Sequence, residues 1–415
     1  MKILFPYLAR WHSANRSRYH QLLAHLCRLG HRVYALTAPP MAINDISAND
    51  ILNGGEPLPP ELTVSELYLP EKLHSFLRRP LPRTKMLKKG LVALTSIPQI
   101  RRFIEKEKID LLLVYNLPQA PLLRLTLQAE CRTHFDLADD LVAMMQVEDK
   151  FAAKVGLMTI ARAVQEDMIL RASTVTVASS VLQEKIKRPV VLLPNGADIA
   201  ELDQADGRAW RARVKGPTVG FVGAFEYWVD FDLVLQTARR LPLVNFLLVG
   251  GGRQMKYLQR HIAQYGLKNF HLTGAVSYQD AMDYVAGMDV CILPFTHDAV
   301  SNGSCPLKIF EYAGLRKPIV STCAQEVMRI GNGWISFADD IATFTGAIES
   351  FLSDQRAAER AGEAGRAIVE RLYNWTNMAR QFEDLLVNGA TPGFEPALAR
   401  RIVLETLESG FETTR

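Results

Sequence analysis

The chain contains 415 residues, enough for one large domain or two ordinary ones. Apolar residues make up 48% of it and charged residues 22%, so it can build sizeable cores and is not globally disordered. The 48 Lys and Arg barely exceed the 44 Asp and Glu, which excludes a protein whose whole surface binds nucleic acid. We therefore expect no nucleic-acid partner.

The cysteines and the apolar runs indicate the compartment. Five cysteines lie far apart without a CxxC pair, which excludes a disulfide framework and a zinc ribbon and favours a reducing compartment. No apolar run approaches the ~18 residues of a membrane-spanning helix. The apolar start of the chain is too short for a signal peptide, so we expect a buried first strand in a cytoplasmic protein.

The first half of the chain alternates between strands and helices. An amphipathic helix is predicted over residues 19–29, and Gly30 ends it. The predicted strands are residues 2–5, 32–36, 110–115, 133–136 and 174–178. This alternation is typical of an α/β fold with helices on both sides of a parallel sheet.

A second series of the same kind follows. Its predicted strands are residues 218–222, 245–249, 270–272, 290–293 and 319–321. Its predicted helices are residues 231–241, 255–265 and 278–286, and residues 357–387 are also helical, with Trp375 where one helix gives way to another.

Two similar doubly wound domains are therefore predicted. The turn residues of 194–198 mark the boundary between them. We expect an N-terminal acceptor-binding domain over residues 1–196 and a C-terminal nucleotide-sugar-binding domain over residues 197–375. The last helices, residues 376–415, are expected to pack back on the N-terminal domain.

Residues 78–108 form a basic segment. They include ten Lys or Arg but only two acids, and apolar residues such as Leu87 and Leu94 are interleaved among the charges. A basic amphipathic stretch can lie on an anionic membrane surface. It can equally be a solvated helix that lines a cleft for a phosphorylated ligand, and both interpretations stay open.

The densest local signal is CPLKIFEYAGLRKPIV, residues 305–320. Pro306 suits the first turn of a helix, and Lys308 and Glu311 would share one helical face. The helix dipole and Lys308 could hold the phosphates of a sugar diphosphate while Glu311 accepts ribose hydroxyls. A surface ion pair is the simpler alternative, and composition alone favours it.

This stretch resembles the nucleotide-binding signature of GT-B glycosyltransferases. Other stretches are similar to motifs of that family and follow in its order: residues 178–182, 193–198, 220–224, 228–230, 248–252, 273–274 and 289–295. The resemblance is strong over residues 178–318 and is greatest to bacterial polysaccharide transferases of the teichuronic acid and xanthan-pathway type.

The resemblance implies a GT-B fold, with two Rossmann-like parallel-sheet domains that face a central cleft. It implies transfer of a sugar from a nucleotide-diphospho-sugar to a saccharide or polyprenyl-linked acceptor, at the inner face of the membrane, with no cofactor. The donor-binding residues it implies are Gly223, Gly250, Gly252, Ser304, Lys308 and Glu311.

The chain departs from the family at one position. Retaining members carry two glutamates eight residues apart; Glu311 matches the second, but Gly303 stands at the first. We therefore expect an inverting transfer, which needs a general base near the acceptor hydroxyl.

Two residues are candidates for that base. Asp139 follows a predicted strand, at the sheet edge where ligands of open α/β sheets bind, and it matches the base of the xanthan-type subgroup. Asp139 or its neighbour Asp140 could instead cap the next helix. His12, in the loop after the first strand, is the second candidate, and Arg10 and Arg16 beside it could clamp a phosphorylated acceptor.

Asp230 and Asp232 form a DxD pair, the metal motif of the other glycosyltransferase fold. Here they open a predicted helix, where acidic residues are favoured, so we interpret them as capping residues and expect no metal. A nucleotide-sugar 2-epimerase of the same fold and a non-catalytic sugar-nucleotide-binding protein remain as alternative functions.

Overall fold

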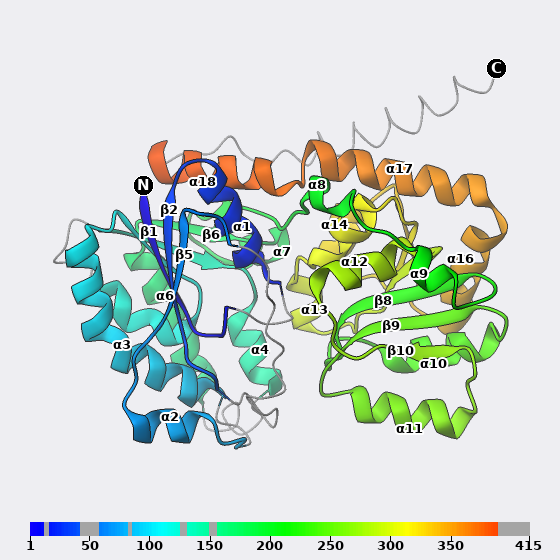
Figure 1. Cartoon of the computed structure of the whole chain (residues 1–415), viewed down its shortest axis with the longest axis horizontal. Helices are drawn as coiled ribbons and strands as arrows, with labels where there is room; N and C mark the ends of the chain where they lie inside the picture. The colour runs from blue at the N-terminus through cyan, green and yellow to red at the C-terminus, as the bar shows by residue number, and fades with distance from the viewer. Residues whose placement is uncertain (12–15, 42–57, 82–84, 125–130, 149–155, 389–415) are drawn as a thin grey trace. The chain divides into compact units, whose positions relative to one another are not determined.

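The computed structural model describes residues 1–11, 16–41, 58–81, 85–124, 131–148 and 156–388 (Figure 1). The chain divides into two units. Unit 1 comprises Met1–Leu193 and the part of α18 (Trp375–Asn388) that starts at Ala379, and unit 2 comprises Pro194–Met378.

Unit 1 is built on a parallel sheet whose described strands follow the order β3-β2-β1-β4-β5-β6-β7. The inner strands are short and mostly buried, as expected for a sheet that is covered on both faces, whereas the two edge strands are less buried. The strands are β1 (Lys2–Tyr7), β2 (Arg32–Thr37), β3 (Leu62–Glu66), β4 (Leu111–Val114), β5 (Arg132–Leu137), β6 (Thr174–Val177) and β7 (Val191–Leu192).

Helices cover both faces of this sheet. They are α1 (Arg18–Arg28), α2 (Glu71–Leu77), α3 (Lys85–Glu107), the 3-10 helix η2 (Leu117–Arg124), α4 (Leu141–Glu148), α6 (Leu157–Arg171) and α7 (Ser180–Lys185). On one face, strand residues such as Leu112 and Phe135 share a core with side chains of α3, η2 and α6. On the other face, the β5 side chain His134 packs edge-on against Phe382 of α18, with ring centroids 4.6 Å apart.

Unit 2 repeats this plan with the strand order β10-β9-β8-β11-β12-β13. The strands are β8 (Thr218–Ala224), β9 (Asn245–Gly251), β10 (Phe270–Leu272), β11 (Val290–Leu293), β12 (Ile319–Ser321) and β13 (Ile335–Phe337). The helices are α8 (Ile199–Leu202), α9 (Arg208–Arg211), α10 (Phe231–Arg240), α11 (Met255–Tyr265), α12 (Tyr278–Ala286), α13 (Ala299–Gly303), α14 (Leu307–Gly314), α15 (Gln325–Gly331), α16 (Ile341–Ser353) and α17 (Gln355–Arg371).

The two faces of the second sheet are covered by different helices. Helices α10 and α16 share a core with the strands on one face, and α12 and α14 contact the strands as well. The predicted fold, two doubly wound parallel-sheet domains, is confirmed.

Three strands are absent from the sequence prediction: β3, β7 and β13. Each lies at the end of its sheet. An edge strand needs no continuous apolar run, because only one of its sides is paired. In β3 only Leu62 is buried, so its polar pattern conceals it in the sequence.

Candidate active site

The second sheet has a topological switch point between β8 and β11. The chain leaves β8 toward β9 on one side, whereas β11 lies on the other side. In open α/β sheets, ligands bind at such a point, outside the carboxyl ends of the strands. The ladder between the two strands ends at the Gly220–Cys291 pair, although β8 continues to Ala224. The carboxyl end of β8 is therefore the expected ligand site of this unit.

Backbone segments approach one another closely at this edge. A Cβ atom on Gly250, whose φ is +132°, would lie 2.0 Å from the carbonyl oxygen of Gly223. A Cβ atom on Gly252 would lie 2.6 Å from the carbonyl oxygen of Phe225, and one on Gly223 would lie 2.6 Å from Cε of Lys308. The three predicted donor glycines are thus brought together. Backbone contacts require glycine at positions 250 and 252, and a φ of +155° favours glycine at position 223.

Lys308 reaches the same edge from α14. Its helix follows Pro306, and its side chain is half-buried beside Gly223. Glu311 lies one turn later and is only 6% exposed. Ser304, the last predicted donor residue, is half-buried and ends α13.

The loop before α14 is held by the turn that opens unit 2. Nδ2 of Asn195 donates a hydrogen bond to the carbonyl oxygen of Cys305 at 2.6 Å. A Cβ on Gly196 would lie 2.5 Å from the carbonyl oxygen of Tyr373, so this turn packs directly on backbone. Asn195 is buried, and sequence reasoning gave it no role beyond a turn.

The corresponding switch point of unit 1 lies between β1 and β4. Arg10 and Arg16 lie on the loop after β1, and both are half-buried. His12, the second candidate base, lies outside the described residues. The two arginines thus follow the carboxyl end of β1, and their role in binding the acceptor stays a prediction.

The three acids at the end of β5 and directly after it have different environments. Asp136 is completely buried, and Oδ2 accepts from Nε of Arg18 at 2.8 Å. Asp140 caps α4, because Oδ1 accepts from the Ala143 N–H at 2.9 Å, and Oδ2 lies 3.0 Å from Nζ of Lys185. Asp139 is exposed. Asp140 is thus the capping residue, and Asp139 is the solvent-accessible acid of the run.

The DxD pair of unit 2 is engaged in local structure. Asp230 is the N-cap of α10, and Oδ1 accepts from the Leu233 N–H at 2.9 Å. Asp232 accepts a hydrogen bond from the Tyr257 hydroxyl. The capping interpretation is confirmed for Asp230. Among the described residues, no cluster of three or more His, Cys, Asp and Glu side chains could hold a metal ion.

Most of unit 2 is similar to a known protein family. Residues 216–354 match the family model described as "Glycosyl transferases group 1". This range contains the glycine-lined edge and α14. Unit 2 therefore contains a group 1 glycosyltransferase domain.

Relatives agree with this assignment. The chain is 25% identical over 232 residues to a Bacillus subtilis (strain 168) protein named as teichuronic acid biosynthesis glycosyltransferase TuaH, a match that covers 52% of this chain and 56% of that protein. It is 24% identical over 308 residues to O-antigen chain mannosyltransferase C of Escherichia coli, covering 70% of this chain and 78% of that protein.

Solved structures show the same fold over nearly the whole chain. Sucrose-phosphate synthase from Thermosynechococcus elongatus superposes with a TM-score of 0.73 at 17% identity, covering 92% of this chain and 98% of that one. Anabaena HepE in complex with UDP-glucose gives a TM-score of 0.65 at 14% identity, covering 94% of this chain and 100% of that one. The predicted GT-B fold and the predicted family resemblance are confirmed.

The group 1 domain has one further charged pair near the glycine-lined edge. Nε of Arg253, directly after Gly252, lies 2.5 Å from Oε2 of the buried Glu226. The guanidinium also lies 5.3 Å from the centroid of the Tyr227 ring. This pair is absent from the sequence prediction. The position of Arg253 directly after three glycines could have indicated that its side chain lies near the same edge.

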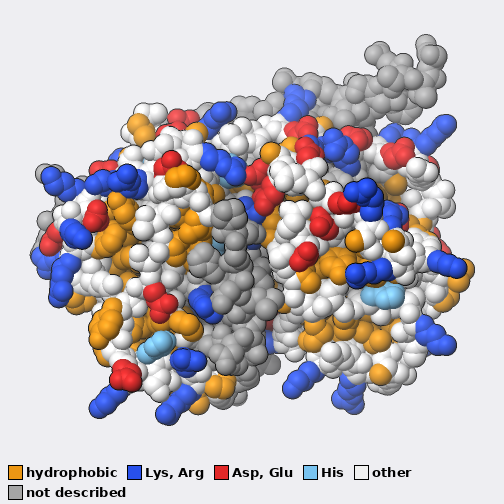
Figure 2. All heavy atoms as spheres, viewed as in Figure 1, with side chains coloured by type: hydrophobic (Ala, Val, Ile, Leu, Met, Phe, Trp, Pro, Cys, Tyr) orange, Lys and Arg blue, Asp and Glu red, His pale blue; other side chains and the backbone are white. Residues whose placement is uncertain are grey.

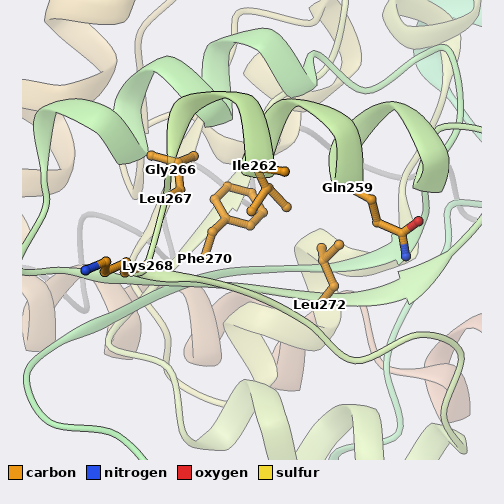
Figure 3. A pocket seen from close by; sticks show the side chains of 8 residues that line it. Gln259, Ile262, Gly266, Leu267, Lys268, Phe270 and Leu272 are labelled. Atoms are coloured by element: carbon orange, nitrogen blue, oxygen red, sulfur yellow. The ribbon is translucent and has the colours of Figure 1, made fainter.

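A separate surface pocket of about 470 Å³ lies between α11 and β10. In Figure 3, Ile262 and Leu267 from the helix side face Phe270 and Leu272 of the edge strand. None of the predicted donor residues lines it. It is therefore distinct from the glycine-lined edge.

The basic segment, residues 78–108, begins at Arg78, the C-cap of α2, and contains all of α3. Leu87 and Leu94 are 56% and 53% exposed, whereas Lys88 is 1% exposed and donates to the carbonyl oxygen of Arg79. Burial lowers the pKa of Lys88. Figure 2 shows Lys and Arg side chains interspersed with hydrophobic ones along this part of unit 1. Within the described ranges, no helix has the length and hydropathy that crossing a bilayer requires.

Proposed function

We propose that the chain transfers a sugar from a nucleotide-diphospho-sugar to a saccharide or lipid-linked acceptor in cell-surface polysaccharide synthesis. The observation that carries the proposal is the contact of Lys308 with Gly223 at the switch point of a group 1 domain. The printed names of the relatives, from teichuronic acid and O-antigen chain synthesis, support the pathway. The UDP-glucose complex of HepE supports a nucleotide-sugar donor.

The donor diphosphate lies at the glycine-lined edge in this proposal. The absence of side chains at Gly223, Gly250 and Gly252 lets the backbone segments and Lys308 pack closely at this edge, which sets the Lys308 ammonium beside the diphosphate. The ammonium of Lys308 offsets the charge that develops on the leaving diphosphate. Glu311 accepts hydrogen bonds from ribose hydroxyls, and Ser304 contributes a hydroxyl beside the helix start. No metal and no cofactor takes part.

Asp139 acts as the general base in an inverting displacement. It is the exposed acid after β5, so an acceptor hydroxyl can approach it. The hydroxyl proton passes to Asp139 while its oxygen bonds to the anomeric carbon of the sugar. The bond from that carbon to the diphosphate oxygen breaks, and the nucleoside diphosphate leaves with the electron pair. His12 is the alternative base.

The acceptor is held by unit 1. Arg10 and Arg16 lie on the loop after β1 and supply cations for a diphosphate in a lipid-linked acceptor. The basic segment, residues 78–108, brings the enzyme to an anionic membrane on the cytoplasmic face, with exposed Leu87 and Leu94 entering the headgroup boundary.

The test combines binding with product analysis. The wild type is screened by thermal shift against UDP, GDP and dTDP, because a ligand that binds the native state raises the midpoint. Incubation with the corresponding sugar donors and an extracted lipid-linked acceptor should give glycosylated product. An epimerised donor without acceptor would show the 2-epimerase, and binding without turnover would show the non-catalytic alternative.

Lys308→Ala tests the site itself. The loss of a hydrogen bond to a charged group corresponds to about 1.5–3 kcal/mol, so the Kd of the nucleoside diphosphate should rise by about 10- to 150-fold. Lys256→Ala, an exposed lysine on α11, is the control and should bind as the wild type does. Unchanged affinity in Lys308→Ala would remove Lys308 from the donor site.

A further inference from the structure

The carboxyl end of β8 lacks its neighbour on the β11 side. The described pairing of these strands consists of Val219 with Val290 and Gly220 with Cys291. On its other side, β8 remains paired with β9 as far as Ala224 and Gly251. The backbone groups of Val222 alternate with those of Phe221 and Gly223, so they face the side from which β11 has diverged.

The hydroxyl of Tyr312 fills this gap. It accepts a hydrogen bond from the Val222 N–H at 2.7 Å and lies 3.4 Å from the Val222 carbonyl oxygen, to which it donates. Tyr312 is completely buried. The side chain therefore takes over the hydrogen bonds that a neighbouring strand would make, and it does so one residue before Gly223.

The same helix carries Lys308. Tyr312 and Lys308 are four residues apart in α14, so they lie on one helical face. Tyr312 bonds Val222, and the Cε of Lys308 contacts the adjacent Gly223. One turn of α14 is thus fixed against two consecutive residues of β8.

We infer that Tyr312 is a positioning residue, which holds β8 and β11 apart at the switch point and sets Lys308 over the Gly223 backbone for a nucleoside diphosphate. This role rests on the proposed donor site, and the Tyr312 hydroxyl is the group that shapes that site. Without the hydroxyl, the buried Val222 N–H has no strand partner, and a buried unsatisfied donor drives local rearrangement.

The other end of α14 is held independently. Nη1 of Arg366 donates to the carbonyl oxygen of Gly314 at 2.5 Å and to Oδ1 of Asp203 at 2.7 Å. Removal of the Tyr312 hydroxyl therefore leaves the helix attached to its unit. Tyr312→Phe also keeps the ring that fills the core, so the variant is expected to fold.

The experiment is a double-mutant cycle on nucleotide affinity. The probe is whichever of UDP, GDP and dTDP gives the largest midpoint rise with the wild type, titrated by calorimetry into wild type, Tyr312→Phe, Lys308→Ala and the double variant. Partial unfolding would lower the binding stoichiometry and leave the Kd of the folded molecules unchanged, so stability and affinity are read separately.

We expect Tyr312→Phe to raise the Kd about five- to tenfold, the equivalent of one lost hydrogen bond. In the Lys308→Ala background it should have no further effect, because the two residues act on one contact. Tyr257→Phe is the matched control: it also loses one tyrosine hydroxyl bond, to Asp232, but leaves the bond to Val222 in place, and it should bind as the wild type does.

Three results would overturn the inference: unchanged affinity in Tyr312→Phe, the same loss in both backgrounds, or the same loss in Tyr257→Phe. Failure of the proposed function would give different results. In that case Lys308→Ala would bind the nucleotide as the wild type does, or the wild type would bind none of the three nucleotides.

Discussion

Arg18 and Asp136 form a buried ion pair in unit 1. Nε of Arg18 donates to Oδ2 at 2.8 Å and Nη2 donates to Oδ1 at 3.1 Å, and the side chains are 4% and 0% exposed. The Thr176 hydroxyl donates to the same carboxylate at 2.7 Å. The pair ties the start of α1 to β5 and so fixes the end of the loop that carries Arg10 and Arg16. It explains why Asp136 is unavailable as a base.

Breaking this pair should destabilise unit 1. Asp136→Ala leaves a buried guanidinium without its charge partner, which costs about 3–5 kcal/mol. The double variant Arg18→Met/Asp136→Leu removes both charges and should be more stable than Asp136→Ala. Urea denaturation checks both. If the double variant were the least stable of the set, the pair would itself be strongly stabilising.

The same ion pair makes the stability of the folded chain depend on pH. Burial raises the pKa of Asp136, but the Arg18 guanidinium and the hydrogen bonds more than offset this and hold it below its ordinary value. The ionised Asp136 carboxylate therefore stabilises the folded state fully at pH values above its pKa in the unfolded chain, about 3.9. This stabilisation is lost as the pH falls through the lower pKa that Asp136 has in the folded state. The stability gap between wild type and Asp136→Ala should stay constant from about pH 5 to 8 and narrow below about pH 4.

Gly223 and Gly251 lie on the neighbouring strands β8 and β9, but an added side chain would meet close atoms only at Gly223. A Cβ on Gly223 would lie 2.6 Å from Cε of Lys308, whereas one on Gly251 would meet nothing closer than 3.8 Å. Gly223→Ala should therefore displace Lys308 and raise the Kd of the nucleoside diphosphate at least tenfold, and Gly251→Ala should leave it unchanged. Calorimetric titration checks both, and equal affinities would show that the contact does not shape the site.

Asp139 and Asp140 allow a matched test of the base. Asp139→Asn should lower the transfer rate by about 10²- to 10⁴-fold, the usual contribution of a general base, with unchanged nucleotide affinity. Asp140→Asn removes the neighbouring charge but keeps an N-cap side chain, so transfer should remain near the wild-type rate. If Asp139→Asn keeps full activity, the base lies elsewhere, and His12→Ala is the next variant to assay.

Transfer should not require a divalent cation. Asp230 caps α10 and Asp232 accepts from Tyr257, so both acids of the DxD pair are already engaged. Activity in excess EDTA should equal that of the untreated enzyme. Loss of activity that Mn²⁺ or Mg²⁺ restores would assign to a metal the charge neutralisation proposed for Lys308.

Membrane binding should depend on the exposed residues of the basic segment. Each cation near an anionic leaflet contributes roughly 1 kcal/mol, so Arg78→Gln/Arg79→Gln should weaken vesicle binding by about five-fold per charge, and salt should weaken it further. Co-sedimentation with vesicles of increasing anionic lipid content measures this. Leu87→Asn/Leu94→Asn tests the apolar contribution.

The control for that experiment removes two charges elsewhere in unit 1. Lys187 and Arg188 are exposed outside the segment, and Lys187→Gln/Arg188→Gln should bind vesicles like the wild type. Lys88 is not a useful position, because its side chain is buried. If both double variants lose binding equally, the effect is one of net charge and the segment has no special role.

The sequence by itself determined the fold class and the family. Buried parallel strands are apolar at nearly every position, so runs such as β4 and β11 are visible without a structure. The stretch around α14 is a local motif, since a lysine and a glutamate three residues apart share a helical face whatever surrounds them. These features depend on neighbours along the chain.

Only the tertiary structure decided which side chains are buried and what they contact. Asp136, Asp139 and Asp140 are equivalent as sequence letters, yet one pairs with Arg18, one is exposed and one caps a helix. The bond from Tyr312 to Val222 joins residues 90 positions apart. Contacts of this kind join α14 to the end of β8, and no local pattern encodes them, because the two segments meet only when the sheet and its helices are packed together.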